Sequence, residues 1–190
     1  EVTNTGDILN NLRTSVIDAL KQTAEEGTQK DGMDMSIVAI NKDRKRALWS
    51  GANNPLYINR KDPQGHIIEG SSPCMALISE KSNLAGLLEI KADKMPVAVH
   101  INMEDFTNHE INIEDGVRLF LFTDGYPDQF GGPKGKKFKY KAFKKLIAET
   151  SDLRIKEQGE LLENELNKWM NWEGSQYGQI DDITVVGLKI

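Results

Sequence analysis

The sequence predicts an α+β fold in which antiparallel strands form sheets and helices cover them. First, residues 7–26 carry leucine, isoleucine and valine at helical spacing, as expected of a helix with one face on a sheet. Second, residues 33–69 alternate strand-like runs with turns and show no helix pattern, which favours antiparallel pairing over β-α-β units. Third, two helix patterns, 140–150 and 151–169, precede a final apolar strand at 183–190.

The individual elements follow from local patterns. The first helix has Thr5 and Asp7 at its expected start and Gly27 at its expected end. Strands are expected at 33–40, 46–50, 56–60, 66–69, 87–90, 109–113, 117–122 and 183–190. Turns rich in Asn, Asp, Gly or Pro separate them, at 41–44, 51–55, 62–65 and 114–116. Residues 94–99 contain a proline and are expected at a sheet edge, 74–78 form a candidate short strand, and 131–137 are a predicted loop.

The composition narrows the class of protein. A chain of 190 residues, 38% of them hydrophobic and 28% charged, can form one substantial core, so we expect a single domain over 1–190. The net charge of −5 argues against general nucleic-acid binding. Cys74 is the only cysteine, which excludes an internal disulfide and suits a reducing, cytoplasmic location. The sequence has no apolar run of membrane-spanning length and no signal-peptide pattern, so we expect no membrane contact by this segment.

A short run rich in Phe and Leu, 117–122, ends in Thr123-Asp124-Gly125 and is predicted to be a buried strand. Gly125 would let the backbone turn sharply or approach a ligand closely. Asp124 has two interpretations. It is either a turn or helix-cap residue, since Asp is favoured at both, or a metal or proton-transfer ligand held on a rigid element.

Asp181 stands just before the final strand. If that strand runs antiparallel to 117–122, as the helical hairpin between them allows, Asp124 and Asp181 emerge at the same sheet edge. Two neighbouring carboxylates repel each other unless they are protonated or bridged by a cation, and oxygen ligands suit Mg²⁺ or Mn²⁺. The three histidines are scattered, so a zinc site is not expected. Asp182 is either a second ligand or a cap and orienter of its neighbour, and Asp128 is interpreted as a turn residue.

Five segments in a fixed order resemble those of a known family. They are Asp31-Gly32-Met33-Asp34, Gly51-Ala52-Asn53-Asn54-Pro55-Leu56-Tyr57, Lys94-Met95-Pro96, Thr123-Asp124-Gly125-Tyr126-Pro127-Asp128-Gln129-Phe130-Gly131-Gly132 and Asp181-Asp182-Ile183-Thr184-Val185. Over nearly the whole chain they resemble the SpoIIE-type branch of the metal-dependent protein phosphatases, the type 2C superfamily. The resemblance implies an α-β-β-α sandwich of two antiparallel sheets flanked by helices, which agrees with the pattern-based prediction.

The resemblance also implies a function and a site. Members of this family hydrolyse phosphoserine or phosphothreonine with a water activated by two Mn²⁺ or Mg²⁺ ions. The matching metal ligands are Asp124 and Asp181, with Gly125, Asp182 and Asp34 as weaker candidates. The expected partners are a phosphoprotein, such as an anti-sigma-factor antagonist, and a sensor or regulatory domain of the parent chain. The alternative is a catalytically inactive regulatory module that binds a phosphoprotein.

The sequence departs from the family pattern in several places. The Asp-x-x-Gly-His-Gly segment, which supplies the ligand shared by both ions, should precede Glu1, and the chain begins without Met. We therefore expect an N-terminally truncated piece of a longer protein, whose missing region could anchor it to a membrane. Residues 71–86 resemble an insertion, and Pro127 is unusual in its motif. We expect the piece alone to fold, to bind metal weakly, to be nearly inactive and to self-associate through an exposed sheet edge.

Residues 134–145 carry seven lysines, among them Lys134, Lys136 and Lys137. One interpretation is a solvated loop and helix face; the other is a basic flap that attracts a phosphorylated substrate. The aromatic residues in this stretch fit anchoring of the following helix better than stacking on bases, so nucleic acid is not an expected partner.

Overall fold

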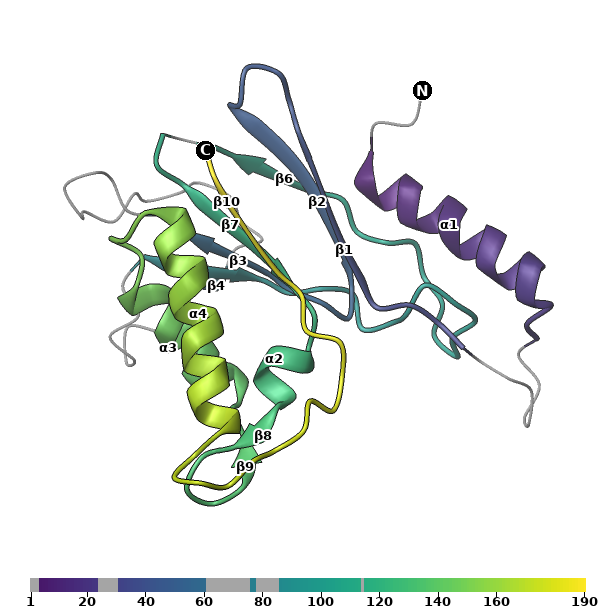
Figure 1. Ribbon diagram of the computed structural model, residues 1–190. Coiled ribbons are helices and arrows are strands. Elements are labelled where there is room, and N and C mark those ends of the chain that lie inside the picture. The colour runs from purple at the N-terminus through teal and green to yellow at the C-terminus, as the bar shows by residue number, and fades with distance from the viewer. Residues whose placement is uncertain (1–3, 24–30, 61–75, 78–85, 114) are drawn as a thin grey trace. The chain divides into compact units, whose positions relative to one another are not determined.

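The computed structural model describes residues 4–23, 31–60, 76–77, 86–113 and 115–190 of the chain (Figure 1). Its elements, in chain order, are α1 (Thr5–Leu20), β1 (Met35–Ile40), β2 (Arg46–Ala52), β3 (Leu56–Asn59), β4 (Ala76–Leu77), β5 (Leu87–Ile90), β6 (His109–Asn112), β7 (Arg118–Phe122), α2 (Gly125–Asp128), β8 (Phe130–Gly131), β9 (Lys136–Lys137), α3 (Tyr140–Glu149), α4 (Ile155–Met170) and β10 (Val185–Lys189). They belong to two compact units. Of the described residues, 4–56 and 90–113 form the first unit, and the others form the second. None of the helices described is both long enough and apolar enough to cross a membrane.

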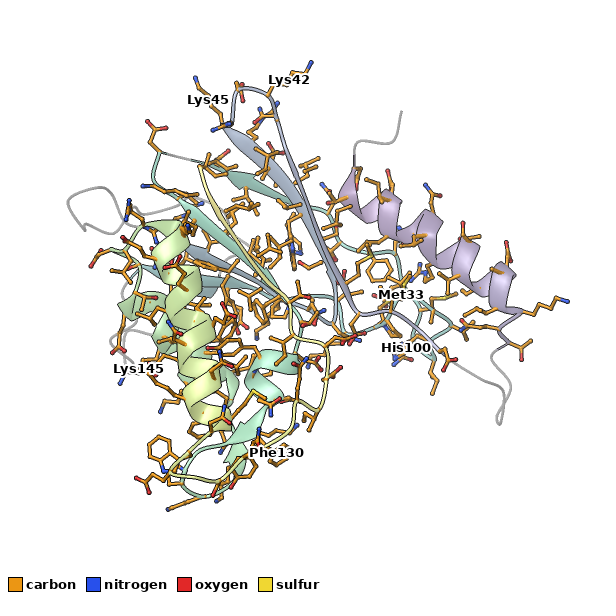
Figure 2. The ribbon with its side chains drawn as sticks, viewed as in Figure 1. Met33, Lys42, Lys45, His100, Phe130 and Lys145 are labelled. Carbon is orange, nitrogen blue, oxygen red and sulfur yellow. The ribbon has the colours of Figure 1, made fainter. Side chains whose placement is uncertain are left out.

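The first unit is a three-stranded antiparallel sheet in the order β1-β2-β6, with α1 packed against it (Figure 1). Trp49 on the central strand pairs with Val38 on one side and with His109 on the other. The predicted turn at 41–44 joins β1 to β2, and Lys42 and Lys45 point outward at its tip (Figure 2). Burial of apolar side chains holds helix and sheet together, because one core cluster of this unit joins Leu9, Ala52, Met95, Val97 and Phe106.

The first helix is shorter than its sequence pattern predicts. Asn4 caps its start, with its side chain accepting from the N–H groups of Gly6 and Asp7. Its last residue is Leu20, because Lys21 adopts the left-handed conformation at φ 51° and closes the helix end. The prediction that the helix reaches residue 26 is therefore wrong, and Gly27 lies outside the described residues.

The second unit is built on a five-stranded sheet in the order β10-β7-β3-β5-β4. The pairs β10–β7, β7–β3 and β5–β4 are antiparallel. Helix α4 lies along β10 and packs on α3 (Figure 1). Aromatic rings fill the core between helices and sheet, with Phe122 on β7 4.6 Å from the ring of Tyr57 and 5.0 Å from that of Phe143. Strand β7, which lies between β10 and β3 and is followed by Thr123 and Asp124, is thus packed against this core.

The other predictions of secondary structure are confirmed in part. The α+β class with antiparallel sheets and covering helices is confirmed, and most strand boundaries agree within two residues. Residues 94–99 form no strand, and Val97 makes an isolated bridge to Met33. The predicted loop 131–137 contains β9 and the end of β8, a hairpin whose turn uses positive φ at Gly132 and Gly135. The expected strand 66–69 lies outside the described residues, and so does most of the segment 71–86. Of the candidate strand 74–78, only the two residues of β4 are described.

Candidate functional site

The first half of the site is the end of β7. Asp124 follows this buried strand and occupies the N-cap position of α2, yet its side chain makes no capping hydrogen bond. Asp124 therefore has the position of a helix cap, but its carboxylate does not make the capping bond. Asp124 is half-buried, and the helical turn after it is fixed by the Asp128 N–H, which donates to the Asp124 carbonyl at 2.9 Å. Pro127 fits this turn because the first-turn positions of a helix need no N–H donor.

The second half of the site lies directly beside the first. Strand β10 pairs antiparallel with β7, with Val185 opposite Phe122, so the expected antiparallel arrangement is confirmed. Beyond the paired strands, the Thr123 N–H donates to the Thr184 carbonyl, and the Thr184 N–H donates to Thr123 Oγ1, each at 3.0 Å. The segment that contains Asp181 therefore leaves the sheet at the same edge as Asp124.

Gly125 brings the two segments into backbone contact. A Cβ atom at this position would lie 2.5 Å from the carbonyl oxygen of Asp182 and 3.0 Å from its carbon. The φ angle of Gly125 is not positive, so the backbone conformation does not require glycine; the close approach does. Thr123 supports the same contact, since its Oγ1 donates to the Asp182 carbonyl at 2.9 Å.

The two neighbouring aspartates of the second segment are both exposed. Asp181 Oδ1 accepts from the Asp182 N–H at 2.7 Å, so the local orienting bond is made by the side chain of Asp181 and not by that of Asp182. The Asp181 carbonyl accepts from Gln179 Nε2 at 2.7 Å. The role of Asp124, Asp181 and Asp182 as metal ligands stays a prediction.

Gln129 is the residue of this site whose role the sequence does not reveal. It follows α2 directly and is completely buried, and its side chain contacts the backbone of the loop that leads to Asp181. The only local signal is a polar residue between the turn of α2 and the apolar β8. Its partners lie some 50 positions further along the chain, beyond the reach of a local pattern.

The remaining candidates occupy other places. Asp34 belongs to the first unit, where its Oδ1 accepts from Asn53 Nδ2 at 2.7 Å. Lys136 and Lys137 form β9, and Lys134 lies in the turn before it; all three are exposed. Lys137 Nζ is 2.7 Å from Asp128 Oδ2, so Asp128 carries an ion pair in addition to ending α2.

The donor chemistry of this edge matches the metals that the sequence predicts. Asp124 and Asp181 supply carboxylate oxygens, which suit Mn²⁺ and Mg²⁺. Among the described residues, no group of three His, Cys, Asp or Glu side chains comes together as a metal cage. The donor type therefore fits these ions, while the two carboxylates provide only part of a coordination shell.

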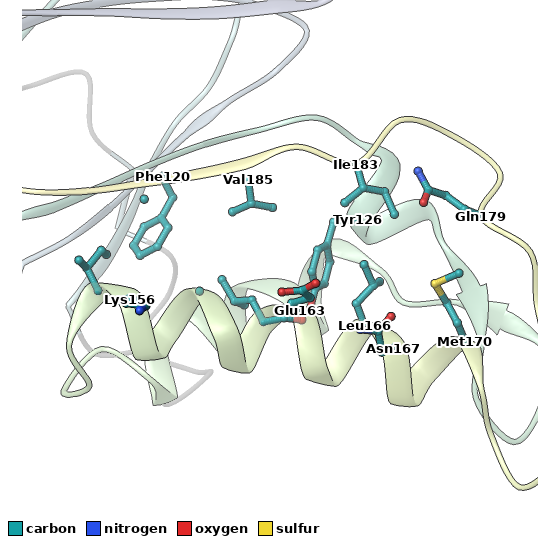
Figure 3. Close-up of a pocket in the computed structure, with 14 residues that line it drawn as sticks. Phe120, Tyr126, Lys156, Glu163, Leu166, Asn167, Met170, Gln179, Ile183 and Val185 are labelled. Carbon is teal, nitrogen blue, oxygen red and sulfur yellow. Dashed lines mark hydrogen bonds between the residues drawn. The ribbon is translucent and has the colours of Figure 1, made fainter.

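A cavity of about 640 Å³ runs between α4 and β10 (Figure 3). Its walls are part apolar, with Leu166 and Met170 from α4, and part polar, with Lys156 and Glu163 from the same helix. Tyr126 closes part of it and is anchored by its hydroxyl, which donates to the Leu162 carbonyl at 2.7 Å. Burial, reinforced by Glu165, raises the pKa of Tyr126, so this phenol stays protonated as a donor. The cavity is separate from the carboxylates, because neither Asp124 nor Asp181 lines it.

Comparisons with known proteins agree with this architecture. The family model of Stage II sporulation protein E (SpoIIE) matches residues 6–190. The SiaA-PP2C domain of Pseudomonas aeruginosa superposes with a TM-score of 0.70 at 21% identity, over 96% of this chain and 59% of that chain. A structure of the PP2C phosphatase domain and a fragment of the regulatory domain of SpoIIE from Bacillus subtilis gives 0.55 at 17% identity, over 96% and 50%.

At these identities the two superpositions support the fold alone, and this chain spans only 59% and 50% of those two chains. No curated protein sequence matches at a significant level. The match of the family model covers nearly the whole chain and agrees with the resemblance found in the motifs. The chain therefore belongs to the SpoIIE family and has the fold of a PP2C-type phosphatase domain.

Proposed function

We propose that this chain forms part of the active site of a metal-dependent protein serine/threonine phosphatase, which hydrolyses phosphoserine or phosphothreonine in a signalling protein. The family and the fold are those of PP2C-type protein phosphatases. The observation that carries the proposal is the meeting of two acidic segments at one sheet edge, where Gly125 touches the Asp182 backbone.

The carboxylates of Asp124 and Asp181 would hold the metal, and Asp182 and Asp34 are weaker candidates. When bound, a pair of Mn²⁺ or Mg²⁺ ions supplies a water of lowered pKa as nucleophile and positive charge for the phosphoryl oxygens. The chain itself contributes one carboxylate next to a buried strand and one carboxylate that is exposed to solvent. Asp124 closely follows a buried strand and is half-buried, whereas Asp181 is open to solvent and accessible to a phosphorylated side chain.

The basic hairpin, β8–β9 with its turn, would attract the substrate. Lys134 and Lys136 are exposed in a chain whose net charge is −5, so they form a local positive surface that favours a phosphorylated or acidic partner. Lys137 is less available to a substrate, because its ammonium group forms an ion pair with Asp128. An anti-sigma-factor antagonist is the kind of partner that the family suggests, and the cytoplasm is the expected compartment.

Substitution of the two aspartates in the full-length protein tests the proposal. Asp124→Ala and Asp181→Ala should each lower Mn²⁺-stimulated hydrolysis of a phosphopeptide by at least about 100-fold, since even outer-shell changes at metal sites cost about 10- to 100-fold. Asp182→Asn should be milder. Asp115→Ala is a matched control, because Asp115 is an exposed aspartate just before the opposite end of β7. It should keep normal activity.

Near-normal activity of Asp124→Ala would refute the metal assignment. A wild-type protein that binds the phosphopeptide with no turnover at saturating Mn²⁺ would instead favour the alternative, a regulatory module that binds a phosphoprotein.

A further inference from the structure

Gln129 has an unusual environment for a side chain next to an exposed carboxylate site. It is 0% exposed, and within the described part of the chain its amide group bonds only to backbone. Its Nε2 donates to the Gly178 carbonyl at 2.9 Å and to the Phe130 carbonyl at 3.1 Å. Its Oε1 accepts from the Ile180 N–H at 3.4 Å. Both ends of this one amide therefore hold the segment 178–180, which leads directly into Asp181.

The backbone of Gln129 is itself fixed by three other parts of the chain. Its carbonyl accepts from Trp169 Nε1 of α4 at 3.1 Å and from the Phe138 N–H at 2.9 Å. Its N–H donates to the Tyr126 carbonyl, and α2 connects it to Asp124 within a single helical turn. A side chain held in this way can transmit the position of α2, and so of Asp124, to whatever it binds.

The segment before Asp181 has few other supports among the described residues. Residues 175–180 form no helix or strand. Tyr177 is half-buried and its N–H donates to the Met170 carbonyl at 2.9 Å, but residues 178–180 are exposed, so apolar burial contributes little to fixing the part of the loop next to Asp181. The Gln179 side chain bonds within the loop, to the Asp181 carbonyl. On the downstream side, Thr123 holds the Asp182 carbonyl. On the upstream side, the anchors next to Asp181 are the two bonds from Gln129 to Gly178 and Ile180.

We propose that Gln129 is a positioning residue that fixes the loop 178–181 against α2 and so sets the separation of the Asp124 and Asp181 carboxylates. The consequence for metal binding rests on the proposed function, whereas the anchoring of the loop does not. A change in the separation of the two carboxylates would weaken metal binding, because metal ligands must be held close to their productive positions by the residues around them.

The test compares two buried glutamines in the full-length protein. Gln158 on α4 is also 0% exposed and also makes three side-chain bonds, to Arg118, to the Ile147 carbonyl and to Thr150 Oγ1. Methionine has a similar length and makes no such bonds, so Gln129→Met and Gln158→Met remove comparable networks. Both variants are studied at a temperature at which they are fully folded.

Hydrogen exchange without metal is the first measurement. In Gln129→Met, peptides covering 178–184 should exchange at least about tenfold faster than in the wild type, because the Ile180 N–H loses its acceptor and the loop its anchor. In Gln158→Met these peptides should exchange at the wild-type rate. Mn²⁺ affinity, measured by calorimetry, is the second measurement. The Kd should rise about 10- to 100-fold in Gln129→Met and stay unchanged in Gln158→Met.

If Gln129→Met does not fold, Gln129→Asn takes its place. It keeps an amide but is one methylene shorter, so it cannot reach both loop partners, and the same two changes are expected. Unchanged exchange of 178–184 would overturn the anchoring, and faster exchange with unchanged Mn²⁺ affinity would overturn the positioning role. Failure of the proposed function has a different signature, in which Asp124→Ala binds Mn²⁺ as the wild type does while the exchange result still stands.

Discussion

Replacing Gly125 by alanine should separate the two halves of the site. The added Cβ would lie 2.5 Å from the Asp182 carbonyl oxygen, 3.0 Å from the Asp182 carbonyl carbon and 3.1 Å from Ile183 Cγ1. Two of these three neighbours are backbone atoms, which cannot swing away as the end of a flexible side chain does. The segment before β10 must therefore shift as a whole, and the carboxylate of Asp181 shifts with it.

The expected magnitude follows from two opposing contributions. Forcing a methyl group into a packed contact costs about 1–3 kcal/mol. Alanine in place of glycine gains up to about 1 kcal/mol in a helix interior, and less here because Gly125 is the first residue of a four-residue helix. The net loss should be about 1–2 kcal/mol. For a chain of this size, each kcal/mol lowers Tm by about 2–4 °C, so Tm should fall by about 2–8 °C.

Gly159→Ala is the matched control. Gly159 lies inside α4, and a Cβ there would meet no atom of the described residues within 4 Å. The same substitution should therefore raise the free energy of unfolding by about 0.5–1 kcal/mol through helix propensity alone. Thermal unfolding by circular dichroism measures both variants, and Mn²⁺ titration of Gly125→Ala reports on the site.

The signs of the two effects decide the outcome. Equal stabilisation by Gly125→Ala and Gly159→Ala would show that the contact with Asp182 is loose, and that glycine is present at position 125 for another reason. Destabilisation of Gly125→Ala with wild-type Mn²⁺ affinity would show a tight contact that does not set the position of Asp181.

Two predictions concern other parts of the chain. Arg118→Ala should lower the free energy of unfolding by about 2–4 kcal/mol, as measured by urea denaturation. The reason is that the buried guanidinium donates to Gln158 Oε1 at 2.6 Å and to the Leu153 carbonyl at 2.5 Å. A loss below about 1 kcal/mol would contradict this prediction. Burial lowers the pKa of His109, against an opposing effect of Asp93, so the unfolded chain binds protons more readily at this position. This contribution to stability should be present above the ordinary pKa of 6.5 and be lost as pH falls below it, and His109→Gln should flatten the stability profile between about pH 5 and 7. Parallel profiles for the two proteins would contradict the second prediction.

Much of the site could be predicted because its main determinants are local. The apolar run before Asp124 identifies a buried strand, and the apolar run after Asp182 identifies another. Once these two are taken as antiparallel, the common edge of Asp124 and Asp181 follows from geometry. The register of β7 and β10 confirms that step.

The parts that could not be predicted depend on long-range contacts or on atomic detail. The end of α1 at Leu20 is decided by the left-handed conformation of Lys21, a residue type with no preference for it. The β8–β9 hairpin could not be predicted because its lysine-rich sequence is typical of a solvated loop. Gly131 is explained only by a distant contact, because the carbonyl of Trp169 would lie 2.1 Å from a Cβ at this position.

The two carboxylates rest on different kinds of support, and this difference has a consequence for mutations. Asp124 follows a strand whose aromatic neighbours form the core, so changes beneath it should reduce stability and the site together. Asp181 is exposed, and the described bonds that hold its segment are a few polar contacts, made by Thr123, by Gln129 and by the Met170 carbonyl, which accepts from the Tyr177 N–H. Loss of such a contact removes little apolar burial, so it should displace the Asp181 carboxylate at a smaller cost to the fold. Substitutions that impair the site while leaving the protein folded should therefore gather around the loop before Asp181.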